Sequence, residues 1–276
     1  MSATTALPQR AVDGAVPGSR YYPTFGRTLA SEWVKLRSLR STWWVLGSTV
    51  AVMVLLSWGA SAQLRSSAKN GSADFTGVDA ITSGVSIAQL VLAVLGVMVA
   101  TNEYSSGMIR ATFSAVPTRT PVVAAKAVVV FLASVVAGVV SLVLAYAVAQ
   151  LVLGPVHLMP DLGEWSTWRG LGGTALFLGL IGLMSLGAGL LLRVTAGGIA
   201  VVVGVLFVLP IVGAIFQSNH VIREIAKFVP GNAGQAFTTT TTSDSLLSPL
   251  AGLIVMLLWA FVPIIVAAVL VKRRDA

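Results

Sequence analysis

Apolar residues occur in six long runs along the chain, separated by shorter segments that carry most of the polar and charged residues. The runs cover residues 43–62, 81–101, 122–152, 170–192, 197–217 and 249–271. Each run is long enough to cross a hydrocarbon core of about 30 Å, which takes about 20 helical residues. The pattern therefore predicts an all-α membrane protein with six transmembrane helices.

Two features refine these predicted helices. Arg193 and the following "TAGG" separate the fourth run from the fifth, so we expect a tight turn there rather than one long helix. The third run is longer than a crossing needs. As a helix it would extend about 46 Å, so we expect it to tilt or to project beyond the bilayer.

The segment "RTLASEWVKLRSLR" (27–40) precedes the first run and has helical periodicity. Leu29, Trp33 and Leu36 share one face, at the spacing i, i+4 and i+7. The rest of the circumference carries the charged residues Arg27, Glu32, Lys35 and Arg37. This pattern predicts an amphipathic helix in the membrane interface, with its basic groups toward anionic head groups. A simple positively charged anchor is compatible with the same pattern.

The segment "NEYSSGMIRATFSAVPTR" (102–119) is long for a turn between two membrane helices. Asn102 and Glu103 end the second run, and Gly107 provides a place to bend. Residues 108–116 then predict a short amphipathic helix, which Pro117 closes. We therefore expect a second interfacial helix between the second and third crossings.

The segment between the fifth and sixth runs is also too long for a simple loop. Residues 222–228 predict a short helix that Pro230 stops, and residues 221–237 either dip into the outer leaflet or form a surface loop. Ser248 followed by Pro249 is typical of a helix start, which places the beginning of the sixth crossing.

Composition supports the membrane prediction, and charge gives an orientation. Of the residues, 56% are hydrophobic and 10% are charged, with mean hydropathy +0.88. With both ends inside, five of the 18 Lys and Arg residues fall outside: Arg65, Lys69, Arg169, Arg223 and Lys227. Cytoplasmic segments of membrane proteins carry the excess of positive charge, so both termini are expected in the cytoplasm. The net charge of +8 then reflects topology rather than nucleic-acid binding.

The first residues have no apolar core of a signal peptide. We expect 1–23 to be a disordered cytoplasmic tail and 24–276 to form a single membrane domain.

Several kinds of chemistry are missing from the sequence. There is no cysteine, and the two histidines, His157 and His220, lack a catalytic or metal-binding pattern. Glu103 and Lys126 lie at the cytoplasmic ends of their helices, and the deep parts of the runs contain no carboxylate, histidine or lysine, which argues against ion-coupled transport. No GxxxxGK[ST] motif occurs, so the chain has no P-loop of its own. Any transport must therefore draw its energy from a partner, and the chain itself is expected to be neither an enzyme nor a cofactor or metal binder.

Three stretches resemble a known family. "EYSSGMIRATFSAVPTRTPVVAAK" (103–126) is similar to the E-Y-x-x-G-T-I-R segment of type-2 ABC exporter permeases, with Met108 in place of the usual Thr. "SEWVKLRSLRSTWW" (31–44) resembles the start of such permeases from high-GC Gram-positive bacteria, and "VPGNAGQAF" (229–237) resembles their outer segment. This class exports drugs and polysaccharides across the bacterial plasma membrane.

The resemblance implies a six-helix half-transporter that pairs with a second permease subunit, as a homodimer, and docks a separate cytosolic ATPase. ATP and Mg would be bound by that ATPase. The resemblance assigns residues 27–40 to a connecting helix and residues 221–237 to short re-entrant helices. It assigns the ATPase contact to a coupling helix that includes Glu103, Tyr104, Gly107, Met108, Ile109, Arg110 and Phe113.

Within the coupling helix, Ile109 and Phe113 would supply the contact, while Glu103 and Arg110 either form a salt bridge or contact the partner. An apolar pathway suits lipophilic drugs, antibiotics or lipids. The alternatives are an ion-coupled secondary transporter and a membrane scaffold or enzyme, which the empty membrane interior and the missing catalytic cluster disfavour.

Overall fold

The computed structural model describes residues 24–71, 75–108, 119–216, 218–240 and 246–273. Throughout this part of the chain the regular structure is helical, with no strand. Six segments are long and apolar enough to cross a membrane, as the sequence predicts. They are α2 (Arg40–Lys69), α3 with α4 (Gly77–Thr82 and Val85–Ser105), α6 (Thr120–Leu153), α7 (Trp165–Leu192), α8 to α9 (Thr195–Ile215) and α12 (Pro249–Arg273).

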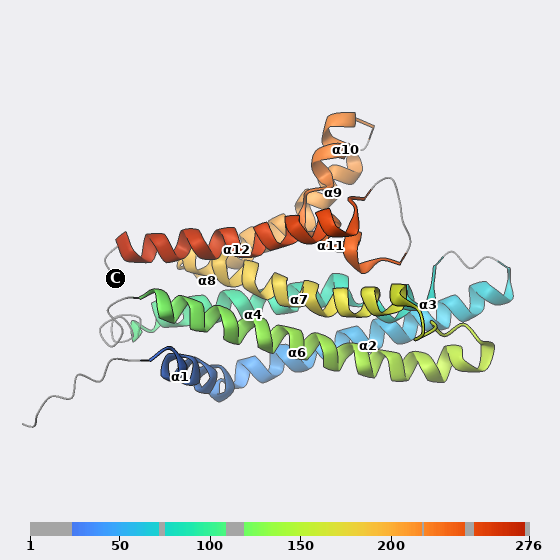
Figure 1. Cartoon of the computed structure of the whole chain (residues 1–276), viewed down its shortest axis with the longest axis horizontal. Helices are drawn as coiled ribbons and strands as arrows, with labels where there is room; N and C mark the ends of the chain where they lie inside the picture. Colours follow the sequence, from blue (N-terminus) through green and yellow to red (C-terminus); the bar gives the residue numbers. More distant parts are fainter. Residues whose placement is uncertain (1–23, 72–74, 109–118, 217, 241–245, 274–276) are drawn as a thin grey trace, which may run out of the picture.

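Helix α7 forms the centre of the bundle and is the most buried of the six candidate spans. It packs against α4, α6 and α12, while α2 lies on the outside against α6 (Figure 1). Close approach between helices depends on glycine: a Cβ on Gly96 of α4 would lie 2.5 Å from the carbonyl oxygen of Gly182 on α7. Small residues allow helix backbones to approach in this way.

Helix α6 continues into a short 3-10 turn, η1 (Gly154–Val156), and with α2 reaches beyond the start of α12 (Figure 1). The predicted turn at Arg193 is present: α7 ends at Leu192, Arg193 adopts the left-handed conformation with φ 58°, and α8 starts at Thr195. The tight turn is confirmed, and the third run forms one helix of 34 residues, whose tilt or projection stays a prediction.

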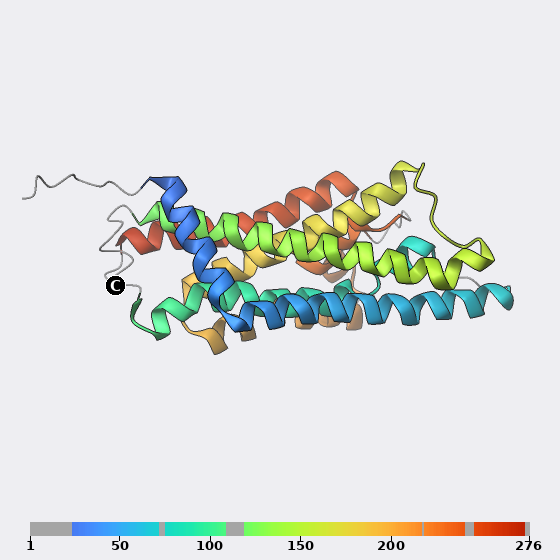
Figure 2. The same ribbon diagram turned by 90° about the horizontal axis from the view of Figure 1, so that it is seen from below.

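Helix α1 (Phe25–Ser38) precedes the bundle and crosses α6 at one end of it (Figure 2). Leu39 adopts an extended conformation, so the chain bends between α1 and α2. The buried residues of α1 are Thr28, Glu32 and Leu36. The sequence places Glu32 with the charged residues outside the apolar face, but the structure buries it against the bundle, while Trp33 of the apolar face is 47% exposed.

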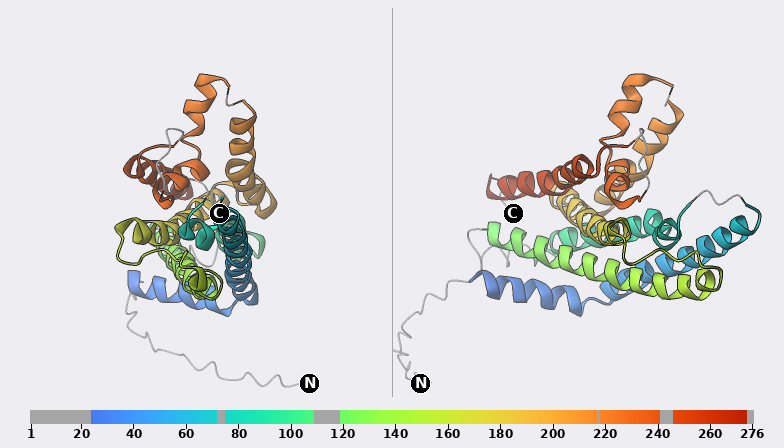
Figure 3. Two further views of the ribbon diagram at one scale, coloured as in Figure 1. Left: turned by 90° about the vertical axis from the view of Figure 1, so that its right-hand side faces the viewer. Right: turned by 45° about the vertical axis from the view of Figure 1, so that its right-hand side comes forward.

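The fifth span is interrupted by a π-helical turn, η2 (Gly204–Val208), which precedes α9 (Leu209–Ile215). After α9 come two short helices, α10 (His220–Ala226) and α11 (Pro230–Thr238). Pro230 follows α10, as the sequence predicts, and is also the first residue of α11. Helices α9 and α10 project away from the bundle, whereas α11 packs against α12 and α7 (Figure 3).

Helix α12 begins where the sequence indicates, because the Ser248 hydroxyl accepts a hydrogen bond from the Ala251 amide. Its carboxyl end lies at the same end of the bundle as α1 (Figure 1). We call this end, where α4 ends and α6 begins, the α1 end.

Candidate functional site

Four charged side chains from three helices meet at the α1 end of the bundle. Lys126 Nζ lies 2.6 Å from Glu32 Oε2 and 2.7 Å from Glu103 Oε1. Lys35 Nζ lies 2.8 Å from Oε1 of each of these two glutamates. These four residues form a closed set of ion pairs, which we call the ion cluster.

The helices place the four side chains in a simple way. Glu32 and Lys35 are one turn apart on α1, so they share a face. Glu103 lies in the last turn of α4, and Lys126 lies in the second turn of α6. Because α1 packs across α6, its Glu32 reaches Lys126. The ion cluster thus joins α1 to the two helices that flank residues 106–119.

The ion cluster is buried and electrically balanced. The side chains of Glu32 and Lys126 are each 4% exposed and that of Glu103 is 6% exposed. Burying a charge is costly unless good partners replace the lost water. Removal of one partner leaves the other charges buried and unpaired. Two carboxylates and two amines balance each other's charge here, and among the described residues only Glu103 Oε2 of the cluster's carboxylate oxygens has no hydrogen-bond partner.

Lys35 is the most exposed member of the ion cluster. Its partial burial lowers the pKa of the amino group, but hydrogen bonds to Glu103 and Glu32, together with the attraction of the two carboxylate charges, outweigh this effect. The pKa of Lys35 therefore lies above its ordinary value, and the amine stays charged at neutral pH.

A cavity of about 440 Å³ adjoins the ion cluster. Lys35, Glu103 and Lys126 line one part of it, and Asn102 and Met108 line another. Met108 is 51% exposed and is the last residue described before the gap at 109–118. The cavity therefore connects the ion cluster with the segment that follows α4.

Further contacts hold both ends of this segment. The Arg193 guanidinium lies 5.2 Å from the centre of the Tyr104 ring, and Tyr104 also packs against Val271 of α12. After the gap, Arg119 Nη1 donates a hydrogen bond of 2.8 Å to the carbonyl oxygen of Val271. The segment is thus anchored on the α7–α8 turn and on α12 as well as on α1.

The residues proposed for coupling fall into two groups. Glu103, Tyr104, Gly107 and Met108 are described, and Gly107 has φ 71°, as expected for a bend. The carboxylate of Glu103 pairs with lysines on α1 and α6. The second group lies outside the described residues and consists of Ile109, Arg110 and Phe113. The predicted helix at 108–116 and the proposed Glu103–Arg110 pair therefore also extend outside the described residues.

Of the residues expected on the interfacial helix, Leu36 is buried, Leu29 is half-buried and Arg37 is exposed. Sequence reasoning missed the roles of Glu32 and Lys126. A usable signal was present, because Thr28, Glu32 and Leu36 recur at spacing i, i+4 and i+8, which puts Glu32 on the same face as a buried leucine.

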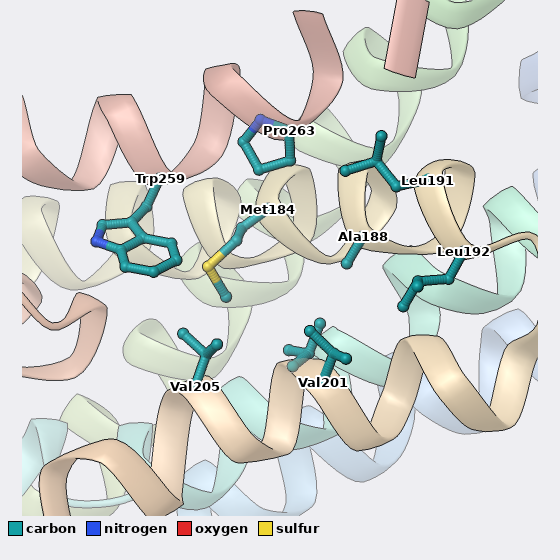
Figure 4. A pocket seen from close by; sticks show the side chains of 9 residues that line it. Met184, Ala188, Leu191, Leu192, Val201, Val205, Trp259 and Pro263 are labelled. Atoms are coloured by element: carbon teal, nitrogen blue, oxygen red, sulfur yellow. The ribbon is translucent and has the colours of Figure 1, made fainter. Parts of the chain in front are cut away.

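A second cavity, of about 210 Å³, lies between α7, the α8–η2 segment and α12 (Figure 4). Met184, Val205, Trp259 and Pro263 are among its lining residues, and all of them are apolar. The described residues also contain no group of three or more side chains suited to hold a metal ion. This cavity offers no ligand for a coupling ion.

Six apolar spans with the ion cluster at one end define a multi-pass membrane protein whose second and third spans are tied to an amphipathic helix. A family model described as "ABC-2 family transporter protein" matches residues 28–192, and the chain belongs to this family. It is the membrane, or permease, component of an ABC-2 transporter. The match runs from α1 to the end of α7 and includes all four residues of the ion cluster. No curated protein matches the chain.

Members of this family typically lack an ATPase domain, and membership implies an ABC ATPase as partner.

Proposed function

We propose that the chain is the permease subunit of an ATP-driven exporter in a bacterial plasma membrane. Two copies would form the substrate pathway, and a separate cytosolic ATPase would bind ATP and Mg and supply the energy. The charge distribution favours the α1 end as the cytoplasmic end, because the topology expected from the sequence assigns 13 of the 18 Lys and Arg residues to the cytoplasmic segments.

The observation that carries this proposal is the ion cluster. It links α1, the end of α4 and the start of α6, the two helices between which residues 106–119 lie in the sequence. A force applied to this segment would move the ends of α4 and α6 together with α1. The ATPase would apply that force as it closes on ATP and opens after hydrolysis.

Within the proposed coupling helix, the residues divide by role. Ile109 and Phe113 present the apolar contact to the ATPase, and Gly107 gives the bend. Glu103 is buried among lysines, so we assign it to positioning the helix rather than to contacting the partner. Lipophilic compounds, including drugs, suit the apolar interior as substrates.

The proposal can be tested with the double variant Ile109→Asp and Phe113→Asp, co-expressed with the ATPase. We expect the ATPase to be lost from the purified complex and transport to be abolished, because two carboxylates replace an apolar contact. The amount of ATPase bound per permease, measured on purified complexes, is the primary readout.

A matched control is available on α10. Val221 and Ile225 are also four residues apart and are each 63% exposed, so Val221→Asp with Ile225→Asp adds the same charges at a distant helix. This control should retain the ATPase. Full retention of ATPase and transport by the Ile109 and Phe113 variant would disprove the coupling role.

A further inference from the structure

A groove of about 560 Å³ follows the outside of the bundle where α1 bends away from α2. The end of α1 closes one end of the groove, and α2 and α6 form its two sides. On each of these helices the lining residues extend over nine positions, 42–50 on α2 and 132–140 on α6, and eight helical rises correspond to about 12 Å.

Side-chain size explains the shape of this groove. Gly47, Ala133 and Ala137 are among the small residues that line it, and the two alanines are buried. Larger side chains beside them, Trp43 and Val136, are both 59% exposed. Small residues between large ones leave a trough along the membrane-facing surface.

One end of the groove is basic. Arg37 lines it at the end of α1, and its lining residues include no aspartate or glutamate. The indole N–H of Trp43 donates a hydrogen bond of 3.0 Å to the Arg37 carbonyl oxygen, which holds the tryptophan at the same end. Among the ion pairs of the described residues, none involves Arg37.

We propose that this groove binds an anionic phospholipid, with one acyl chain in the trough and the head group beside Arg37. The arrangement fits a molecule with an extended apolar part and an anionic end. Arg37 lies at the end of α1 and Trp43 in the first turn of the first candidate span, and basic and indole side chains at the ends of spans are those that meet lipid head groups. This inference does not depend on ATPase coupling.

Occupation of the groove would have a structural consequence. Helix α1 contacts α6 extensively but touches α2 much less. A lipid that contacts Leu36 on α1 and also both walls would hold α1 against the bundle. The buried face of α1 carries Glu32 of the ion cluster, so the lipid would support that cluster from the membrane side.

The experiment supplies the full-length chain with phosphatidylglycerol or with phosphatidylcholine that has identical acyl chains. Native mass spectrometry then measures how much of each lipid the chain retains. Gly47→Leu fills the trough, since a Cβ at Gly47 meets no atom within 4 Å. Gly59→Leu is the matched control, because Gly59 lies on the same helix, is equally unobstructed and is outside the groove. Arg37→Gln removes the charge alone.

The wild-type chain should retain phosphatidylglycerol in preference to phosphatidylcholine, and Gly59→Leu should behave in the same way. Gly47→Leu should lose most of the retained lipid, and Arg37→Gln should reduce the preference for the anionic lipid about fivefold, the effect of one basic residue near an anionic surface.

Three results would each overturn the proposal. These are equal retention of both lipids by the wild-type chain, unchanged retention by Gly47→Leu, and a smaller number of permease chains per complex in Gly47→Leu. The last result would identify the groove as a contact between subunits, and the same mass spectra report it.

Discussion

Removal of Lys126 from the ion cluster should strongly destabilise the fold. Lys126→Met deletes the amine that lies 2.6 Å from Glu32 and 2.7 Å from Glu103, while both carboxylates stay buried. Breaking a buried ion pair on one side costs about 3–5 kcal/mol. At about 2–4 °C per kcal/mol for a chain of this size, the melting temperature should fall on the order of 10 °C.

A double-mutant cycle separates the ion pairing from other effects of the substitution. Glu103→Gln alone leaves an excess positive charge, whereas the double variant leaves Glu32 and Lys35 as a neutral pair 2.8 Å apart. The double variant should therefore lose less stability than the sum of the single variants, by about 2 kcal/mol. The measurement is thermal unfolding of the purified chain in detergent.

The control for this cycle is Lys227→Met. Lys227 pairs with Glu224 at 3.0 Å, but the Glu224 side chain is 44% exposed, and such exposed pairs contribute little. Its melting temperature should stay close to that of the wild type. An additive double variant, or a Lys126→Met variant as stable as the control, would refute the conclusion that the ion cluster holds the three helices together.

Two further predictions concern helix packing and pH. In Gly187→Ala the new Cβ would lie 2.6 Å from Pro263 Cβ, so the free energy of unfolding should fall by about 1–3 kcal/mol. In the control Gly172→Ala no atom lies within 4 Å of the new Cβ, so the free energy of unfolding should not fall. Because the pKa of Lys35 is raised above 10.5, its stabilisation is complete at lower pH and disappears only as the pH rises through that raised pKa. The difference in melting temperature between wild type and Lys35→Met should therefore be constant from about pH 6 to 9 and shrink above pH 10.5; a difference that changes near neutral pH would contradict this assignment.

The six spans could be predicted from the sequence because a membrane crossing imposes a minimum length of apolar residues, and local chemistry marks several boundaries. Arg193 adopts the left-handed conformation between two apolar runs, and Ser248 caps α12. The bend at Gly107 follows from the same kind of local reasoning. These features depend on a few neighbouring residues, so no knowledge of the tertiary fold is needed.

The ion cluster could not be predicted in this way. Glu103 and Lys126 are 23 residues apart, and both join Glu32 and Lys35 only when α1 lies across α6. An amphipathic pattern separates charged residues from the apolar face, which is why Glu32 was grouped with the other charged residues and not with the buried ones. Pairing of opposite charges overrides that rule once the partners are buried together.

Contact between the segment after α4 and an ATPase can be measured directly by site-specific cross-linking. The chain has no cysteine, so Met108→Cys introduces a unique thiol at an exposed position beside Gly107. Leu162→Cys, at an exposed position in the connection between α6 and α7, is the control. With a short bifunctional reagent in intact membranes, Met108→Cys should form a cross-linked product with the ATPase and Leu162→Cys should not. Absence of that product from membranes in which the ATPase is bound, or equal cross-linking at both positions, would contradict the proposed coupling.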